Sequence, residues 1–73
     1  MTDTFNRAFK EWRNDYKMLT ELVMVLNHKI WQHYEQGDNT LAQLYNKYWE
    51  TADAYAMDNL KDDQLSYFLE VTD

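Results

Sequence analysis

The sequence predicts an all-α fold, and three features of its composition indicate this class. Its 73 residues include no proline and only one glycine, so long stretches can form helices without interruption. Apolar residues make up 45% of the chain and aromatic residues 16%, which is enough to build a packed core. Because a chain of this length has room for a single core, we expect residues 1–73 to form one helical domain.

The first predicted element is a long helix from about Thr4 to about Gln36. Gly37 follows at a position where a left-handed residue can end a helix. The apolar side chains of this segment alternate at spacings of four and three residues, which is the heptad pattern of helices that pack along a seam. They are Phe5, Phe9, Trp12, Tyr16, Leu19, Val23, Leu26 and Ile30.

The second predicted helix begins at Thr40 and ends near Asn59. Thr40 and Gln43 have the spacing of a capping box, in which the two side chains bond to each other's backbone amide. Most apolar residues of this segment fall on one side of a helical wheel, so that side must be buried. Only about three residues separate the two helices, and we therefore expect them to form an antiparallel hairpin.

A short C-terminal helix is predicted to follow. Asp62 or Asp63 can cap its start, and Leu65, Phe68 and Leu69 have helical spacing. We expect this helix to fold back over the hairpin.

The first predicted helix should be longer than the second helix that packs on it. At 1.5 Å per residue it would extend about 50 Å, whereas the second helix would be under about 30 Å. The first half of the seam therefore needs another partner, and a second copy of the chain can supply it. We expect a homodimer, forming a dimeric helical bundle, through Phe5, Phe9, Trp12, Tyr16 and Leu19.

A monomeric arrangement is the alternative. In this alternative the long helix breaks near Asn14–Asp15, and the C-terminal helix packs on the first half. The product would be a closed bundle within one chain.

The residues that catalysis or metal binding needs are missing. The chain has no cysteine, its one serine is Ser66, and Gly37 alone cannot form a phosphate-binding loop. His28 and His33 are five residues apart, which places them about 140° apart around a helix and prevents them from sharing a metal. We therefore expect no enzymatic activity, no cofactor and no metal.

The charge of the chain favours a protein partner with a basic surface. The formal net charge is −6, and the whole acidic excess lies in residues 37–73, which hold eight acidic and two basic residues. Such a chain should be repelled by phosphate backbones and by anionic membranes, so we expect no direct contact with nucleic acid or membrane. Without a signal-peptide pattern or a cysteine, we expect a cytoplasmic location.

Two groups of residues are candidates for contact with that partner. The first comprises carboxylates on the outer face of the 40–59 helix and at the start of the C-terminal helix: Glu50, Asp53, Asp58, Asp62 and Asp63. The second comprises aromatic residues that lie outside the main apolar seams: Trp31, Tyr34 and Tyr67.

The function predicted from these features is that of a non-enzymatic inhibitor. A row of carboxylates can imitate the phosphates of a nucleic acid and occupy the basic groove of a nucleic-acid-binding protein, as phage or mobile-element inhibitors do. Ordinary solubility charge would explain the same carboxylates. The alternative function is a structural or assembly module that pairs through its heptad helix.

Overall fold

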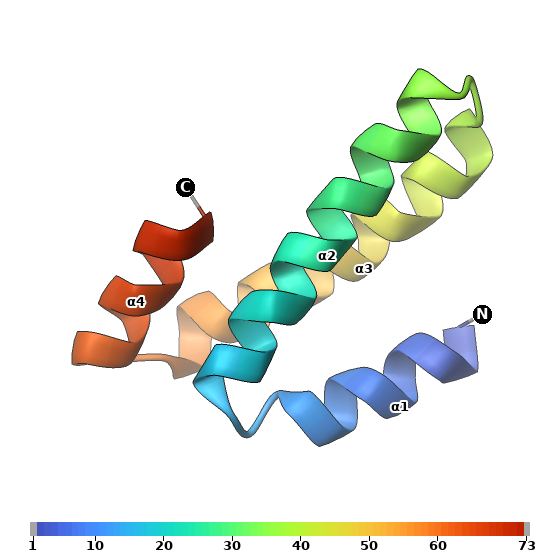
Figure 1. Cartoon of the computed structure of the whole chain (residues 1–73). Helices are drawn as coiled ribbons and strands as arrows, with labels where there is room; N and C mark the ends of the chain where they lie inside the picture. Colours follow the sequence, from blue (N-terminus) through green and yellow to red (C-terminus); the bar gives the residue numbers. More distant parts are fainter. Residues whose placement is uncertain (1, 73) are drawn as a thin grey trace.

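The structure is a computed structural model that describes residues 2–72, and these residues form four helices (Figure 1). Helix α1 covers Thr2–Trp12, α2 covers Tyr16–Glu35, α3 covers Asn39–Asn59 and α4 covers Asp62–Thr72. No strand occurs within this range. The predicted all-α class is confirmed, and so is the end of the second predicted helix at Asn59.

Helices α2 and α3 make the largest contact in the structure. They lie side by side and run in opposite directions (Figure 1). Helix α3 contributes small side chains, since Ala42, Ala52 and Ala56 have no exposed surface and let the two backbones approach closely. Facing them, α2 contributes larger apolar side chains, namely Leu19, Leu22, Val23, Leu26 and Ile30.

Gly37 ends α2 as the sequence predicts. Its φ of 79° is left-handed, which glycine adopts without the steric cost that a side chain brings. The Gly37 amide donates to the Tyr34 carbonyl at 3.0 Å, and the Asp38 amide donates to the His33 carbonyl at 2.8 Å. This pair of hydrogen bonds is the Schellman motif, which satisfies carbonyls that the helix end leaves without partners.

The predicted cap of the following helix is wrong. Helix α3 begins at Asn39, and its N-cap is Asp38, whose Oδ1 accepts from the Leu41 amide at 3.1 Å. Asp38 directly follows the left-handed Gly37, so the chain has already turned when it reaches this carboxylate. The capping box that starts at Thr40 comes two residues too late to be used.

The predicted continuous helix from Thr4 to Gln36 is also wrong, because α1 ends at Trp12 and α2 begins at Tyr16. Asp15 lies between them in an extended conformation and caps α2. Its carboxylate accepts from the amides of Lys17, at 2.9 Å, and Met18, at 3.3 Å. Aspartate favours such a cap over a helix interior, where its side chain competes with the backbone ladder.

Helix α1 turns back beneath α2 and α3 (Figure 1). It contacts α2, and its aromatic side chains pack on those of α3. Phe5 stacks on Tyr48 with ring centroids 4.2 Å apart, and Phe9 meets Tyr55 edge to face at 5.4 Å. The Arg13 guanidinium carbon lies 5.7 Å from the centroid of the Tyr55 ring, within cation–π range. Aromatic contacts within the same chain thus cover the first half of the heptad pattern.

The monomeric alternative correctly predicts that the long helix breaks near Asn14–Asp15. Its prediction of the helix that covers the first half is wrong. Helix α4, which that alternative placed on the first half of the long helix, packs mainly on α2 and α3. Its Phe68 is buried in the core beside Leu60. Helix α4 begins at Asp62, within the predicted range. Its first amides, of Gln64 and Leu65, bond to the Lys61 carbonyl rather than to the predicted capping carboxylate of Asp62 or Asp63.

The Asp15 cap should contribute measurably to stability. Asp15→Ala removes the acceptor of two amides at the start of α2, and we expect it to lower the free energy of unfolding by about 1 kcal/mol. Urea unfolding followed by far-ultraviolet circular dichroism would measure the loss. Asp15→Asn is the control, because asparagine caps equally well and should stay within about 0.5 kcal/mol of the parent. Equal losses for both variants would contradict the capping role.

Candidate protein-binding surface

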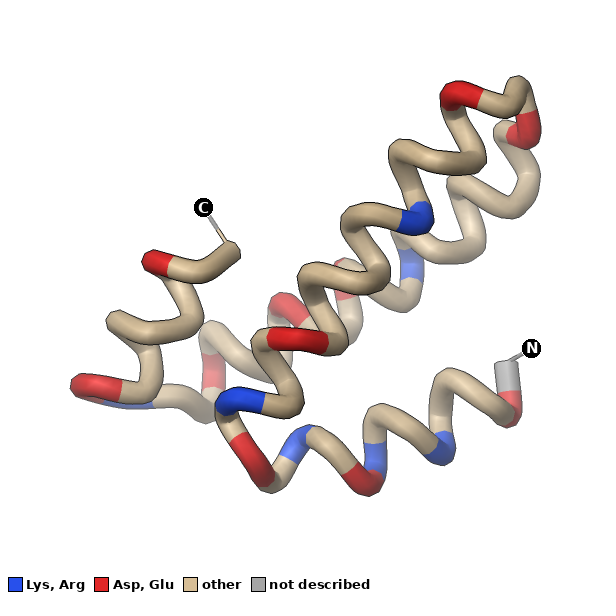
Figure 2. Tube along the Cα trace, in the orientation of Figure 1, with Lys and Arg blue, Asp and Glu red and all other residues tan. Residues whose placement is uncertain are grey.

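Four of the five predicted carboxylates are accessible to a partner. Glu50, Asp58, Asp62 and Asp63 are all exposed. The side-chain Nδ2 of Asn46 donates a hydrogen bond to Glu50 Oε1 at 3.1 Å. Within residues 2–72 none of the four carboxylates forms an ion pair. Figure 2 shows acidic positions spread over α3 and α4, whereas acidic and basic positions are mixed along α1 and the turn after it. The C-terminal half therefore presents negative charge that the chain does not neutralise.

Asp53 differs from the expectation that it lies on the outer polar face beside Glu50. It is half-buried and lines a groove together with Trp49 of α3 and Leu69 of α4. The difference arises because α4 returns along this side of α3, a tertiary contact that a helical wheel does not contain. Burial raises the pKa of the Asp53 carboxyl above its ordinary value.

The groove that holds Asp53 lies between α2, α3 and α4 and has a volume of about 570 Å³. We call it the Asp53 groove. Among the lining residues within 2–72, Asp53 is the only charged side chain, and most of the others are apolar. The lining residues are Val23, Met24, Asn27, Trp49, Asp53, Leu69, Val71 and Thr72.

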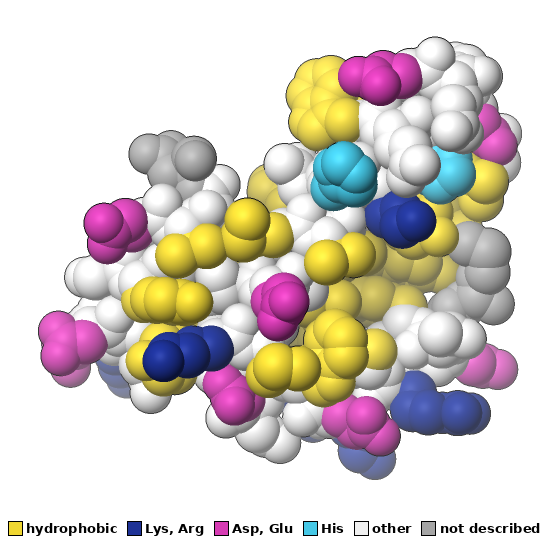
Figure 3. Space-filling view, in the orientation of Figure 1, with side chains coloured by type: hydrophobic (Ala, Val, Ile, Leu, Met, Phe, Trp, Pro, Cys, Tyr) yellow, Lys and Arg dark blue, Asp and Glu magenta, His cyan; other side chains and the backbone are white. Residues whose placement is uncertain are grey.

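A second groove of about 560 Å³ adjoins the first between α2 and α4, and both grooves are lined by Met24 and Val71. Glu21 supplies the acidic group of this second groove. Figure 3 shows hydrophobic side chains gathered on this side of the molecule, with acidic side chains among them. Met24, Val25, Leu69 and Val71 keep between 36% and 48% of their surface exposed. These four residues form what we call the α2–α4 face.

The α2–α4 face was not predicted from the sequence, although a signal for it exists. Residues 22–26 are five consecutive apolar residues. A helix that packs on one side can bury only about half of such a run. Leu22, Val23 and Leu26 are buried against α3 and its neighbours, so Met24 and Val25 remain outside.

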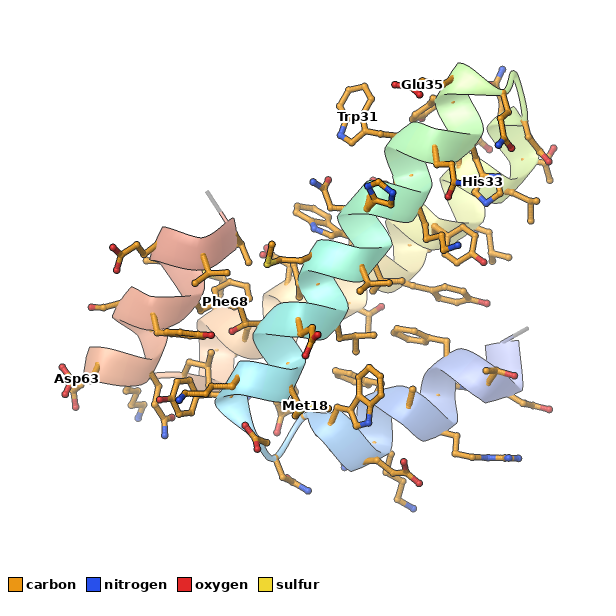
Figure 4. The ribbon with its side chains drawn as sticks, in the orientation of Figure 1. Met18, Trp31, His33, Glu35, Asp63 and Phe68 are labelled. Atoms are coloured by element: carbon orange, nitrogen blue, oxygen red, sulfur yellow. The ribbon has the colours of Figure 1, made fainter. Side chains whose placement is uncertain are left out.

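The predicted aromatic contacts do not lie together with the acidic residues. Trp31 is 61% exposed and lies far from Asp63 (Figure 4). Tyr34, three residues further along α2, is 45% exposed. Their ring centroids are 6.1 Å apart. Tyr67 is half-buried and packs edge to face on Tyr16 at 5.3 Å. The structure therefore separates the aromatic candidates into two places.

The residues predicted to form a homodimer are largely covered by their own chain. Phe5 and Leu19 are buried, and Phe9, Trp12 and Tyr16 are half-buried. A third groove of about 350 Å³ remains beside α1, with Phe5, Trp12 and Val25 among its lining residues.

The possible metal ligands of the chain are its histidines and carboxylates. Within residues 2–72 no group of three or more His, Asp or Glu side chains is placed to hold a metal ion. His28 is exposed, while His33 is half-buried and stacks on Tyr45 with ring centroids 5.3 Å apart. No helix in the same range combines the length and apolar composition that crossing a bilayer requires.

Comparison of this chain with protein-family models, with curated proteins and with solved structures finds no match. Its class is therefore defined by the fold and the surface alone. Within residues 2–72 it is a small protein of four helices, with exposed carboxylates on its C-terminal half and an exposed apolar face between α2 and α4.

Asp53→Asn should stabilise the protein at neutral pH. Because burial raises the pKa of Asp53 in the folded state, the folded state binds this proton more tightly than the unfolded state, whose aspartate has a pKa of about 3.9. Stability therefore falls as the pH rises through that window, and the ionised carboxylate opposes folding at pH 7. We expect Asp53→Asn to add up to about 0.5 kcal/mol at pH 7.

This gain should disappear as the pH is lowered below about 3.9, where aspartate is protonated in both states. Urea unfolding of both proteins at several pH values would measure it. Asp58→Asn is the matched control because Asp58 is exposed at the end of the same helix. A gain that is independent of pH, or equal in the control, would contradict the role of burial.

Proposed function

We propose that this chain is a small, acidic, non-enzymatic protein that binds a basic surface of another protein. The observation that carries the proposal is the group of exposed carboxylates on α3 and α4 that no cation of residues 2–72 neutralises. Residues 37–73 hold eight acidic and two basic residues, whereas the five acidic and five basic residues of 1–36 balance. Figure 2 shows the acidic positions of α3 and α4 apart from the mixed charges of α1. Such an asymmetry orients an approaching partner of opposite charge.

The most concrete form of this proposal is an inhibitor that covers a nucleic-acid-binding surface. Glu50, Asp58, Asp62 and Asp63 would occupy the positions of phosphates on the target. Exposed charges of this kind mainly raise the association rate and select the partner. Lasting affinity requires burial of apolar surface, which the α2–α4 face can supply. We place the protein in the cytoplasm, and a phage or mobile element is the genetic setting that fits such an inhibitor.

Charge reversal at Glu50 tests the proposal. Against a basic, nucleic-acid-binding target obtained by affinity capture, we expect Glu50→Lys to reduce the association rate constant by about threefold to tenfold at low salt. Surface plasmon resonance at several salt concentrations would measure it. The loss should shrink as salt screens the charges. Nucleic acid should compete with the parent protein for the same target.

Glu35→Lys is the matched control for this experiment. Glu35 is also exposed, but it lies at the end of α2, far from Asp63 (Figure 4). The control should keep most of the parental association rate. Equal effects of both reversals would show that net charge alone acts, and affinity that is independent of salt and of Glu50 would refute the proposal.

A structural or assembly module that pairs through the first part of the chain is a second candidate function. Two observations favour it. The heptad spacing runs from Phe5 to Ile30 without a change of phase across the break between α1 and α2. In addition, the groove of about 350 Å³ beside Trp12 is lined almost wholly by apolar side chains. A second copy that fills this groove would produce the dimeric bundle and bury the half-exposed aromatic residues.

Light scattering coupled to size-exclusion chromatography tests this second candidate. The chain has a mass of 8.9 kDa, so a dimer would have about twice this mass at both low and high salt. Trp12→Ala should return the dimer to the single-chain mass because it removes the largest side chain beside the groove. Trp31→Ala, which alters a distant exposed indole, should leave the dimer intact. A single-chain mass for the parent protein at all concentrations would exclude this candidate.

A further inference from the structure

We propose that the Asp53 groove receives one arginine side chain of the protein partner, with the Asp53 carboxylate binding its guanidinium group. This inference rests on the proposed function and names the chemistry that the partner must present. The groove is distinct from the exposed carboxylates, because its acidic group is half-buried in a groove that apolar side chains of three helices help to line.

The composition of the groove matches the two parts of an arginine side chain. The three methylene groups of the arginine can lie against Met24 and Val71, since long cationic side chains commonly pack their stems on apolar surface. The planar guanidinium can then bond both oxygens of Asp53. The indole of Trp49, which lines the same groove, provides an aromatic surface for the cation. At about 570 Å³ the groove has the size of pockets that enclose small ligands.

Asn27 adds a polar group on the opposite wall. It lies on α2, whereas Asp53 lies on α3, and both line the groove. Its amide oxygen can accept from a guanidinium N–H that the carboxylate leaves unpaired. The Thr72 hydroxyl is already engaged as a donor, because it bonds to the Phe68 carbonyl at 2.6 Å. Acceptors from two helices thus face a cavity that a five-donor group can fill.

The electrostatic state of Asp53 favours binding of a cation. Asp53 forms no ion pair within residues 2–72, and burial already raises its pKa in the free protein. Part of the desolvation that an ion pair requires is therefore complete before the partner arrives. Arginine fits better than lysine, because its guanidinium is more weakly hydrated and bonds a carboxylate at two points. The exposed carboxylates of α3 and α4 lack this preorganisation.

Charge also favours a basic partner over a second copy of this chain as the occupant. Two copies would each carry a net charge of −6, so their association at the acidic side would be opposed by repulsion. The chain has two arginines. Arg13 is already engaged, with its guanidinium carbon 5.7 Å from the Tyr55 ring centroid and 5.8 Å from that of Phe9. Arg7 lies on α1, which contributes no residue to the groove, so it does not occupy the groove of its own chain.

A matched set of helical peptides tests the proposal on the full chain. Each peptide is acetylated, amidated and based on Ala and Gln, with Leu at positions i and i+7 of one face and the test residue at i+3. The test residue is arginine, lysine or citrulline, which is the neutral counterpart of arginine. Titrations followed by ¹H–¹⁵N NMR would report the dissociation constants and the resonances that move, including the indole N–H of Trp49.

We expect the arginine peptide to bind about tenfold more tightly than the citrulline peptide, with lysine between them. The Trp49 indole and the amides near Asp53 and Val71 should shift most. Asp53→Asn should abolish the preference for arginine over citrulline. The fold is expected to tolerate this substitution, since it removes an unfavourable buried charge. Asp58→Asn, which neutralises an exposed carboxylate of the same helix, should retain the preference.

Several results would overturn the proposal. These are equal affinities of the arginine and citrulline peptides, an equal loss in Asp53→Asn and Asp58→Asn, or no shift in the groove at up to about 5 mM arginine peptide. Such results would leave the proposed function intact if Glu50→Lys still slows association with the basic target. The converse result is that the peptides bind with arginine selectivity at Asp53 while the affinity for the basic target does not depend on salt or on Glu50. That result would refute the proposed function and support the arginine site in the Asp53 groove.

Discussion

The contact between α2 and α3 is the interaction on which the rest of the structure depends. Its closeness comes from Ala42, Ala52 and Ala56, whose methyl groups are fully buried and leave space for the larger side chains of α2. Helices α1 and α4 have 11 residues each, which is too short for a stable isolated helix in water. Both depend on surfaces that the α2–α3 pair provides, including Tyr48 for Phe5 of α1. Larger side chains at the alanine positions would separate the pair and disturb both short helices.

The sequence predicted the features that short-range chemistry decides. The helical class follows from composition, and the end of α2 follows from Gly37, whose backbone only glycine adopts easily. The break after Trp12 could not be read from periodicity, because the heptad spacing continues through it. Local capping by Asp15 and stacking of Phe5 on Tyr48 together outweigh the helical turn that is lost there. The second of these contacts links residues far apart in the chain.

The sequence also predicted those parts of the candidate surface that depend on one helix alone. The exposure of Glu50 and Asp58 follows from the polar side of one helix, and Trp31 is exposed because it lies outside the apolar seam. Asp53 lies on the same polar side, yet α4 covers it in part. A helical wheel describes one helix alone and cannot show that another helix packs beside its polar side. The half-buried carboxylate and the groove around it are therefore properties of the tertiary structure.

The partial burial of Asp53 is informative because it lowers the stability of the fold. A chain of 73 residues without a disulfide has little free energy of folding to spare. An ionised carboxylate that is half-buried in the groove it shares with Trp49 and Leu69 opposes folding, and a neutral residue of the same shape would not. Places where a sequence breaks the rules of stability tend to be sites of function, since recognition and stability favour different side chains. The exposed carboxylates add charge at no such cost and suit long-range attraction. Asp53 is half-buried in a groove lined in part by apolar side chains and suits the selection of one cationic side chain at short range.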